Sequence, residues 1–92
     1  MDGKTYHVKI AGQVQGVAFR HYTKLHADST GISGWVRNCL DGSVETVISG
    51  SPEQLDEMVS WLHTGSPAAV VTNVTVTETQ QNTLAGSFEI RY

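Results

Sequence analysis

The sequence contains a single cysteine and no long apolar run. Cys39 cannot form a disulfide within the chain, and a lone thiol suits a reducing compartment. No stretch approaches the ~20 apolar residues that a membrane-spanning helix needs. The first five residues also lack the apolar core of a signal peptide. We therefore expect a cytoplasmic protein with no membrane segment.

Basic residues and grouped metal ligands are also scarce. The chain has six Lys and Arg and a net charge of −3, whereas nucleic-acid binding rests mainly on basic side chains that neutralise phosphates. We expect no nucleic-acid partner, although a small anion can still bind where the local field is positive. The four histidines show no metal-ligand spacing; His21 and His26 would point about 140° apart on a helix. We expect no metal ion.

The first part of the chain predicts a strand, a loop and a helix. Tyr6, Val8 and Ile10 fall at every second position, the pattern of a half-buried strand, and Gly12 is expected to end it. A helix is predicted from about Phe19 to Thr30, with glycines beyond it as a stop signal. One side of this helix carries Tyr22, Leu25 and Ser29.

The remainder predicts a hairpin, a second helix and two further strands. Residues 35–40 and 43–49 read as strands that flank Asp41-Gly42, a two-residue signal for a tight hairpin turn. Ser51 and Gln54 form a capping box at the start of the second helix. Residues 70–76 and 88–92 show the last two strand patterns. The apolar stripe of the second helix consists of Leu55, Met58, Val59 and Leu62.

This order of elements, βαββαβ with a short C-terminal strand, predicts a ferredoxin-like α+β sandwich. We expect an antiparallel sheet with both helices on one of its faces. The length suits one domain over residues 1–92. Because such a fold hosts many unrelated functions, the function must be argued from a site.

The loop between the first strand and the first helix can bind an anion. Its sequence, GQVQGVAFR (residues 12–20), places several unpaired backbone N–H groups at the positive end of a helix dipole. Gly16 allows a sharp turn and close approach to a ligand, and Arg20 offers a planar, charged fork that matches phosphate oxygens. On spacing alone, an ordinary loop with a solvated arginine explains the pattern better than an anion site does.

Asn38 is the second polar residue that needs an explanation, because asparagine is disfavoured inside strands. Its amide either hydrogen-bonds a neighbouring loop or holds a water molecule beside a bound phosphate. We expect it to come near the first helix only if its strand neighbours the first strand.

Together, the two segments resemble the acylphosphatase family. IAGQVQGVAFR, from Ile10 to Arg20, is similar to the first family signature, and GWVRNCLDGSVETVISG, from Gly34 to Gly50, is similar to the second. Both match without a gap at the positions that define the pattern. Ala18, Arg37 and Cys39 occupy positions where we expect the family to vary. The element order agrees along nearly the whole chain, and the size suits a small stand-alone member.

The resemblance implies an enzyme that hydrolyses the carboxyl-phosphate bond of acyl phosphates to a carboxylate and inorganic phosphate. Arg20 would bind the substrate phosphate, Asn38 would orient the attacking water, and neither a metal nor a cofactor would be needed. The partners would be these small molecules alone, and we expect a monomer. The residues implied to bind phosphate, mainly through backbone N–H groups, are Gln15, Gly16, Val17, Ala18, Phe19 and Arg20.

Acyl phosphates make such a small site chemically sufficient. Carboxylic acids have pKa values of about 4, so the departing oxygen needs little or no protonation at neutral pH. Positioning and electrostatic stabilisation then suffice. Histidine is a common general base, but His21 is turned by about 100° from Arg20, and we expect it to flank the helix. We expect Cys39 to face away from Asn38, and Asp41 and Glu45 to serve the turn and a solvated strand face.

Two other functions compete with this hypothesis. A module with the same site could bind an anion without hydrolysing it. A ferredoxin-like domain could also bind single-stranded RNA on its open sheet face, which requires aromatic residues in the central strands and basic surroundings. Trp35 is the one aromatic residue clearly within either predicted central strand, and the charge is negative. The RNA hypothesis is therefore disfavoured.

Overall fold

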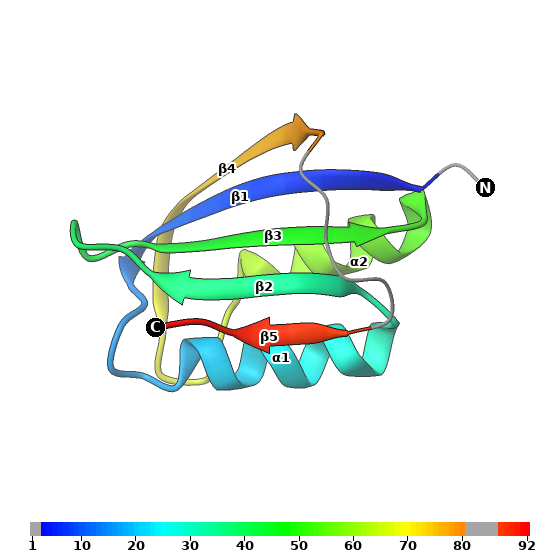
Figure 1. Cartoon of the computed structure of the whole chain (residues 1–92). Coiled ribbons are helices and arrows are strands. Elements are labelled where there is room, and N and C mark those ends of the chain that lie inside the picture. Colours follow the sequence, from blue (N-terminus) through cyan, green and yellow to red (C-terminus); the bar gives the residue numbers. More distant parts are fainter. Residues whose placement is uncertain (1–2, 81–86) are drawn as a thin grey trace.

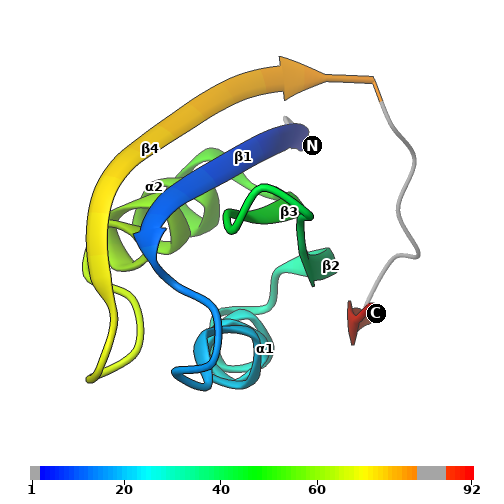
Figure 2. The same ribbon diagram turned by 90° about the vertical axis from the view of Figure 1, so that its left-hand side faces the viewer.

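The computed structural model of the protein describes residues 3–80 and 87–92. Its strands form one sheet in the order β4-β1-β3-β2-β5, and both helices lie on the same side of it (Figures 1 and 2). The elements are β1 Lys4–Gln13, α1 Phe19–Thr30, β2 Ser33–Asn38, β3 Val44–Gly50, α2 Pro52–Leu62, β4 Val70–Thr79 and β5 Phe88–Ile90.

The predicted ferredoxin-like α+β sandwich is confirmed. All pairings among β1 to β4 are antiparallel, as expected. The C-terminal strand β5 instead pairs with β2 in parallel, so the five-stranded sheet is mixed. β5 lies at the opposite edge of the sheet from β4 and runs in the same direction as β2.

The core lies between the sheet and the two helices. In the β1–β3 pair, Val8 lies opposite Thr46 and Ile10 opposite Val44, and opposite residues share a face of the sheet. All four are fully buried. The predicted capping box of α2 is confirmed, because Ser51 Oγ accepts from the Gln54 N–H and Gln54 Oε1 accepts from the Ser51 N–H. From α2, the buried core residues are Leu55, Met58 and Leu62.

The first helix has the predicted bounds, and its buried face is not the side that carries Tyr22, Leu25 and Ser29. Its buried residues are Phe19, Thr23 and Ala27, which recur at i, i+4 and i+8. Tyr22 and Leu25, grouped together from the sequence, are 39% and 50% exposed. Because α1 has few apolar residues, its periodicity is weak, and the burial of Phe19 fixes the rotation of the helix.

The predicted end of β1 was wrong. β1 does not end at Gly12 but continues to Gln13, with a register shift against β4 between Ala11 and Gly12. Gly12 has φ of 129°, and a Cβ there would lie 2.1 Å from the Val70 carbonyl oxygen. The strand therefore continues because glycine tolerates this close approach.

The β2–β3 connection is also longer than the predicted two-residue turn. Cys39 N–H donates to the Ser43 carbonyl at 2.8 Å, which leaves the three residues 40–42 as the loop. Gly42 has φ of 92°, the left-handed residue typical of three-residue hairpin loops. Asp41 Oδ1 accepts from Ser43 N and Ser43 Oγ at 3.0 and 2.6 Å, and these bonds stabilise the longer turn.

Candidate active site

A pocket of about 250 Å³ lies at the start of α1. Its lining comes from three segments of the chain. These are Val14, Gly16 and residues 18–21 around the loop and first helical turn, Asn38 at the end of β2, and Ile90 and Tyr92 around the end of β5. The pocket therefore brings together Arg20 and Asn38, the two predicted catalytic residues.

The loop before α1 has an unusual backbone. Gly16 and Ala18 have φ of 74° and 60°, both in the left-handed region. Ala18 is the one described non-glycine residue with positive φ, a conformation that costs about 1–2 kcal/mol. Among the described residues, no backbone N–H group of residues 15–20 donates to a backbone carbonyl outside the regular helix and strand bonds. These N–H groups therefore remain available to an anion at the positive end of the helix.

Buried residues hold this loop at both ends. Val14 and Phe19 are 1% and 2% exposed, and the Phe19 ring packs 5.9 Å from the Trp61 ring between centroids. Ser66 Oγ donates to the Val17 carbonyl at 2.8 Å, which orients that peptide. The side chains of Gln15 and Val17 do not belong to the pocket lining. Val14 and Phe19 thus anchor the loop.

The guanidinium of Arg20 contacts the two residues that follow β5. Its Nη1 donates to the Arg91 carbonyl at 3.3 Å, and its guanidinium carbon lies 4.7 Å from the centre of the Tyr92 ring. Sequence reasoning missed Ile90 and Tyr92 as pocket residues. Their alternation with Phe88 indicated a common face of a strand, but nothing indicated that β5 lies beside β2.

Arg20 is also electrostatically distinct from the other basic residues. In residues 3–80 and 87–92, it is the one Lys or Arg of six with no carboxylate within 4.0 Å. The positive charge of the pocket is therefore not neutralised locally, although the chain is acidic overall. The paired residues are Lys4 with Glu78, Lys9 with Asp41, Lys24 with Asp28, Arg37 with Glu45 and Arg91 with Glu89.

Asn38 lines the same pocket and carries an unsatisfied acceptor. Its Oδ1 is buried and has no hydrogen-bond partner in the described structure, whereas buried polar atoms are nearly always paired. The expectation that β2 must neighbour β1 was wrong, because β3 lies between them. Asn38 reaches the pocket because α1 packs against β2, so the start of the helix lies beside the end of that strand.

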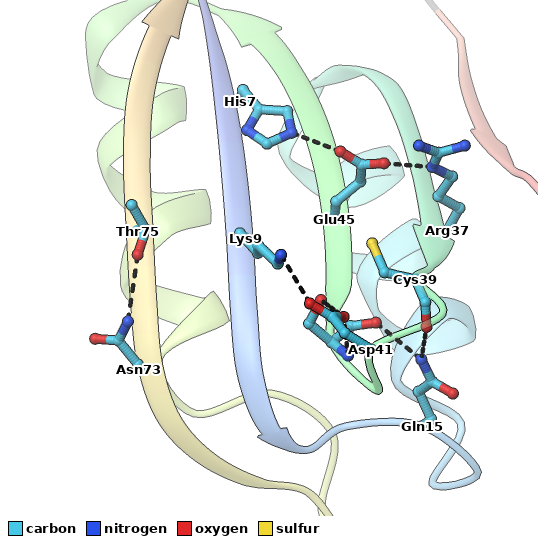
Figure 3. Close-up of polar contacts among 10 residues, drawn as sticks. His7, Lys9, Gln15, Arg37, Cys39, Asp41, Glu45, Asn73 and Thr75 are labelled. Carbon is cyan, nitrogen blue, oxygen red and sulfur yellow. Dashed lines mark hydrogen bonds and ion pairs between the residues drawn. The ribbon is translucent and has the colours of Figure 1, made fainter.

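The other titratable candidates lie at the rim or on the opposite face. His21 does line the pocket, but it is exposed and its ring packs against Tyr22. In Figure 3, the Cys39 thiol lies on the same side of the sheet as the Glu45 carboxylate. That side is the open face, which carries His7 and Arg37.

Asp41 and Glu45 are both held by hydrogen bonds and ion pairs. A hydrogen bond from the Ser43 hydroxyl, aided by Lys9, holds the pKa of Asp41 well below its usual range. Partial burial alone raises the pKa of Glu45, but hydrogen bonds from His7 and Arg37 lower it overall (Figure 3). The expected solvated face at Glu45 was wrong, since its side chain is 13% exposed and bound on both sides.

Residues 3–80 and 87–92 contain no group of three or more His, Cys, Asp or Glu that could hold a metal ion. Neither helix there is long and apolar enough to cross a membrane.

Known proteins with similar sequences or structures include several acylphosphatases. The sequence matches the acylphosphatase family over residues 6–90. It is 55% identical over 71 residues to an acylphosphatase of Paraburkholderia xenovorans, which covers 77% of this chain and 73% of that protein. An acylphosphatase of Burkholderia lata is 51% identical over 77 residues, or 84% of this chain and 79% of that protein.

Solved structures agree with the sequence relatives. The crystal structure of an acylphosphatase from Bacillus subtilis aligns with a TM-score of 0.89 at 36% identity, covering 96% of this chain and 98% of that one. An acylphosphatase from Coxiella burnetii aligns with a TM-score of 0.90 at 34% identity, covering 97% of this chain and 93% of that one. The similarity thus extends over almost the whole fold.

Proposed function

This chain belongs to the acylphosphatase family, and we propose that it hydrolyses acyl phosphates with Arg20, the preceding loop and Asn38 as its working groups. Water attacks phosphorus in line with the bond to the carboxylate, and the products are a carboxylate and inorganic phosphate. The observation that carries the proposal is one pocket lined by both the unpaired Arg20 cation and the unpartnered Asn38 carbonyl.

The phosphoryl group binds at the start of α1. Backbone N–H groups of residues 15–20 donate to its oxygens, and the guanidinium of Arg20 donates two parallel charge-assisted bonds. The present bond from Arg20 to the Arg91 carbonyl is long, at 3.3 Å, so phosphate oxygens are the stronger partner. The same donors stabilise charge that develops on the oxygens in the transition state.

Asn38 orients the attacking water. Its buried Oδ1 accepts a hydrogen bond from that water and so fixes the direction of the lone pair that attacks phosphorus. An amide is too weak a base to remove the proton, and we propose that the proton passes to the substrate's own phosphate. The carboxylate leaves without an acid catalyst because it is stable at neutral pH.

The same site defines the partners that we propose. The protein acts as a cytoplasmic monomer on small acyl phosphates, is inhibited by inorganic phosphate, and requires no nucleic acid, membrane, metal or cofactor. Size-exclusion chromatography with light scattering tests the monomer, and fractionation of the producing cells tests the compartment. A mass of two chains, or recovery outside the cytoplasmic fraction, would contradict these points.

A turnover assay with a chelator tests the function directly. Purified protein in EDTA is expected to release inorganic phosphate from benzoyl phosphate, with competitive inhibition by added phosphate. Binding of phosphate by calorimetry without turnover would instead establish the non-catalytic anion-binding module. Loss of activity with EDTA and recovery with a divalent metal would contradict the metal-independent mechanism.

Replacing Asn38 tests the division of roles within the site. Asn38→Ala should lower kcat by about 10²-fold and change the inhibition constant for phosphate by less than about threefold, because the water, not the phosphate, loses its partner. Steady-state kinetics measures both constants. Equal losses in kcat and phosphate affinity would show that Asn38 binds the anion instead.

A further inference from the structure

The side chain of Gln15 connects the loop before α1 to the turn that follows Asn38. Its Nε2 donates to the Cys39 carbonyl at 2.7 Å and to the Ser43 carbonyl at 2.9 Å, and Figure 3 shows the amide directed at the hairpin. A primary amide has two N–H hydrogens, so both donors are used. The residue belongs to the loop before α1, and its partners frame the turn that follows β2.

These two carbonyls are close to Asn38 in the chain and rigidly held. Cys39 is bonded directly to Asn38, and its carbonyl also accepts from the Gly42 N–H at 3.2 Å. The Ser43 carbonyl also accepts from the Cys39 N–H at 2.8 Å. The Gln15 amide thus fastens the anion-binding loop to a stiff turn that begins one residue after the water-orienting side chain.

We propose that Gln15 is a positioning residue, whose amide sets the distance and angle between the bound phosphate and the water held by Asn38. This inference rests on the proposed function. In-line attack requires the two halves of the site to be aligned closely, and a misplacement of about 1 Å can cost about 10²-fold in rate. β1 and β2 are not neighbours in the sheet, so direct strand pairing does not supply this alignment.

Removing the Gln15 amide should lower kcat without weakening phosphate binding. The anion donors lie on the loop and on α1 itself, so they stay together when the amide is removed. Gln15→Met keeps the length of the side chain and removes both donors. It should lower kcat about 10- to 100-fold, while the inhibition constant for inorganic phosphate changes by less than about threefold.

The variant is expected to fold, because both carbonyls keep a backbone hydrogen bond when the Gln15 amide is lost. Gln54→Met is a matched control. Gln54 also makes two hydrogen bonds through its amide, accepting from Ser51 N–H at 2.8 Å and donating to the Thr30 carbonyl at 3.1 Å. These contacts lie away from the pocket, so this variant should keep the kcat of the unmodified protein.

The experiment measures benzoyl phosphate hydrolysis and phosphate inhibition for the unmodified protein, both single variants, Asn38→Ala and the Gln15→Met/Asn38→Ala double variant. If Gln15 acts through Asn38, its substitution should cost less than about threefold in kcat once Asn38 is already Ala. Additive losses in the double variant, or equal kcat for Gln15→Met and Gln54→Met, would overturn the inference. Absence of turnover in the unmodified protein would overturn the proposed function instead.

Discussion

The guanidinium of Arg20 contacts a carbonyl and an aromatic ring rather than a carboxylate. Its charge is therefore available to an incoming anion, whereas the guanidinium of Arg37 is bound to Glu45 on the other face of the sheet. Sequence reasoning identified the position of Arg20 through the loop pattern and the family signature. It could not reveal that Lys4, Lys9 and Arg37 are paired, because these pairs depend on strand register and on turns.

Replacing Arg20 or Arg37 by lysine tests the difference between these two arginines. Arg20→Lys keeps the charge but loses the planar fork, so we expect kcat/KM to fall about 10²-fold and phosphate inhibition to weaken. Arg37→Lys is the matched control and should leave kcat/KM within about threefold of the unmodified protein. Equal effects of the two substitutions would show that the fork of Arg20 has no special role in binding.

At the scale of elements, the sequence predicted strongly patterned segments well and weakly patterned ones poorly. The capping box and stripe of α2 were correct because several local signals agree there. The buried face of α1 could not be predicted, because Phe19 and Thr23 carry too little periodic signal to define it. The hydrogen bonds of the Gln15 side chain could not be predicted for another reason, since its partners are backbone atoms 24 and 28 residues away.

The junction before α1 gives a prediction at this scale. Ala18→Gly should raise the free energy of unfolding by roughly 0.5–1 kcal/mol. Relief of the left-handed conformation, about 1–2 kcal/mol, exceeds the entropic cost of adding a glycine, about 0.4–1 kcal/mol. Urea denaturation followed by Trp fluorescence measures the change. Ala27→Gly is the control and should lower stability, because that alanine is helical and fully buried.

At the scale of the whole molecule, the sequence gives the order of elements but not every spatial neighbour. Alternation and turn signals were enough to predict the two-layer sandwich. They did not predict that β5 lies parallel to β2, or that α1 packs where Asn38 ends its strand. Such contacts depend on how separate elements pack. The site depends on this packing, because its three lining segments, at residues 14–21, 38 and 90–92, lie far apart in the sequence.

On the open face of the sheet, one carboxylate links residues of three strands. Glu45 of β3 contacts His7 of β1 at 2.6 Å and Arg37 of β2. These bonds lower the pKa of Glu45 despite the opposing effect of its burial. A carboxyl with a lowered pKa in the folded state stabilises the protein above its unfolded pKa. That stabilisation is lost as the pH falls through the folded pKa.

Acid unfolding should therefore depend on Glu45. Glu45→Gln is expected to lower the free energy of unfolding by on the order of 1–2 kcal/mol near pH 7. The difference should shrink as the pH falls below the ordinary glutamate pKa of about 4.3. Making both measurements in a His7→Gln background removes the titration of the imidazole and leaves Arg37 as the charged partner. A difference that stays constant from pH 7 to pH 3 would mean that Glu45 stabilises the sheet through packing rather than through its charge.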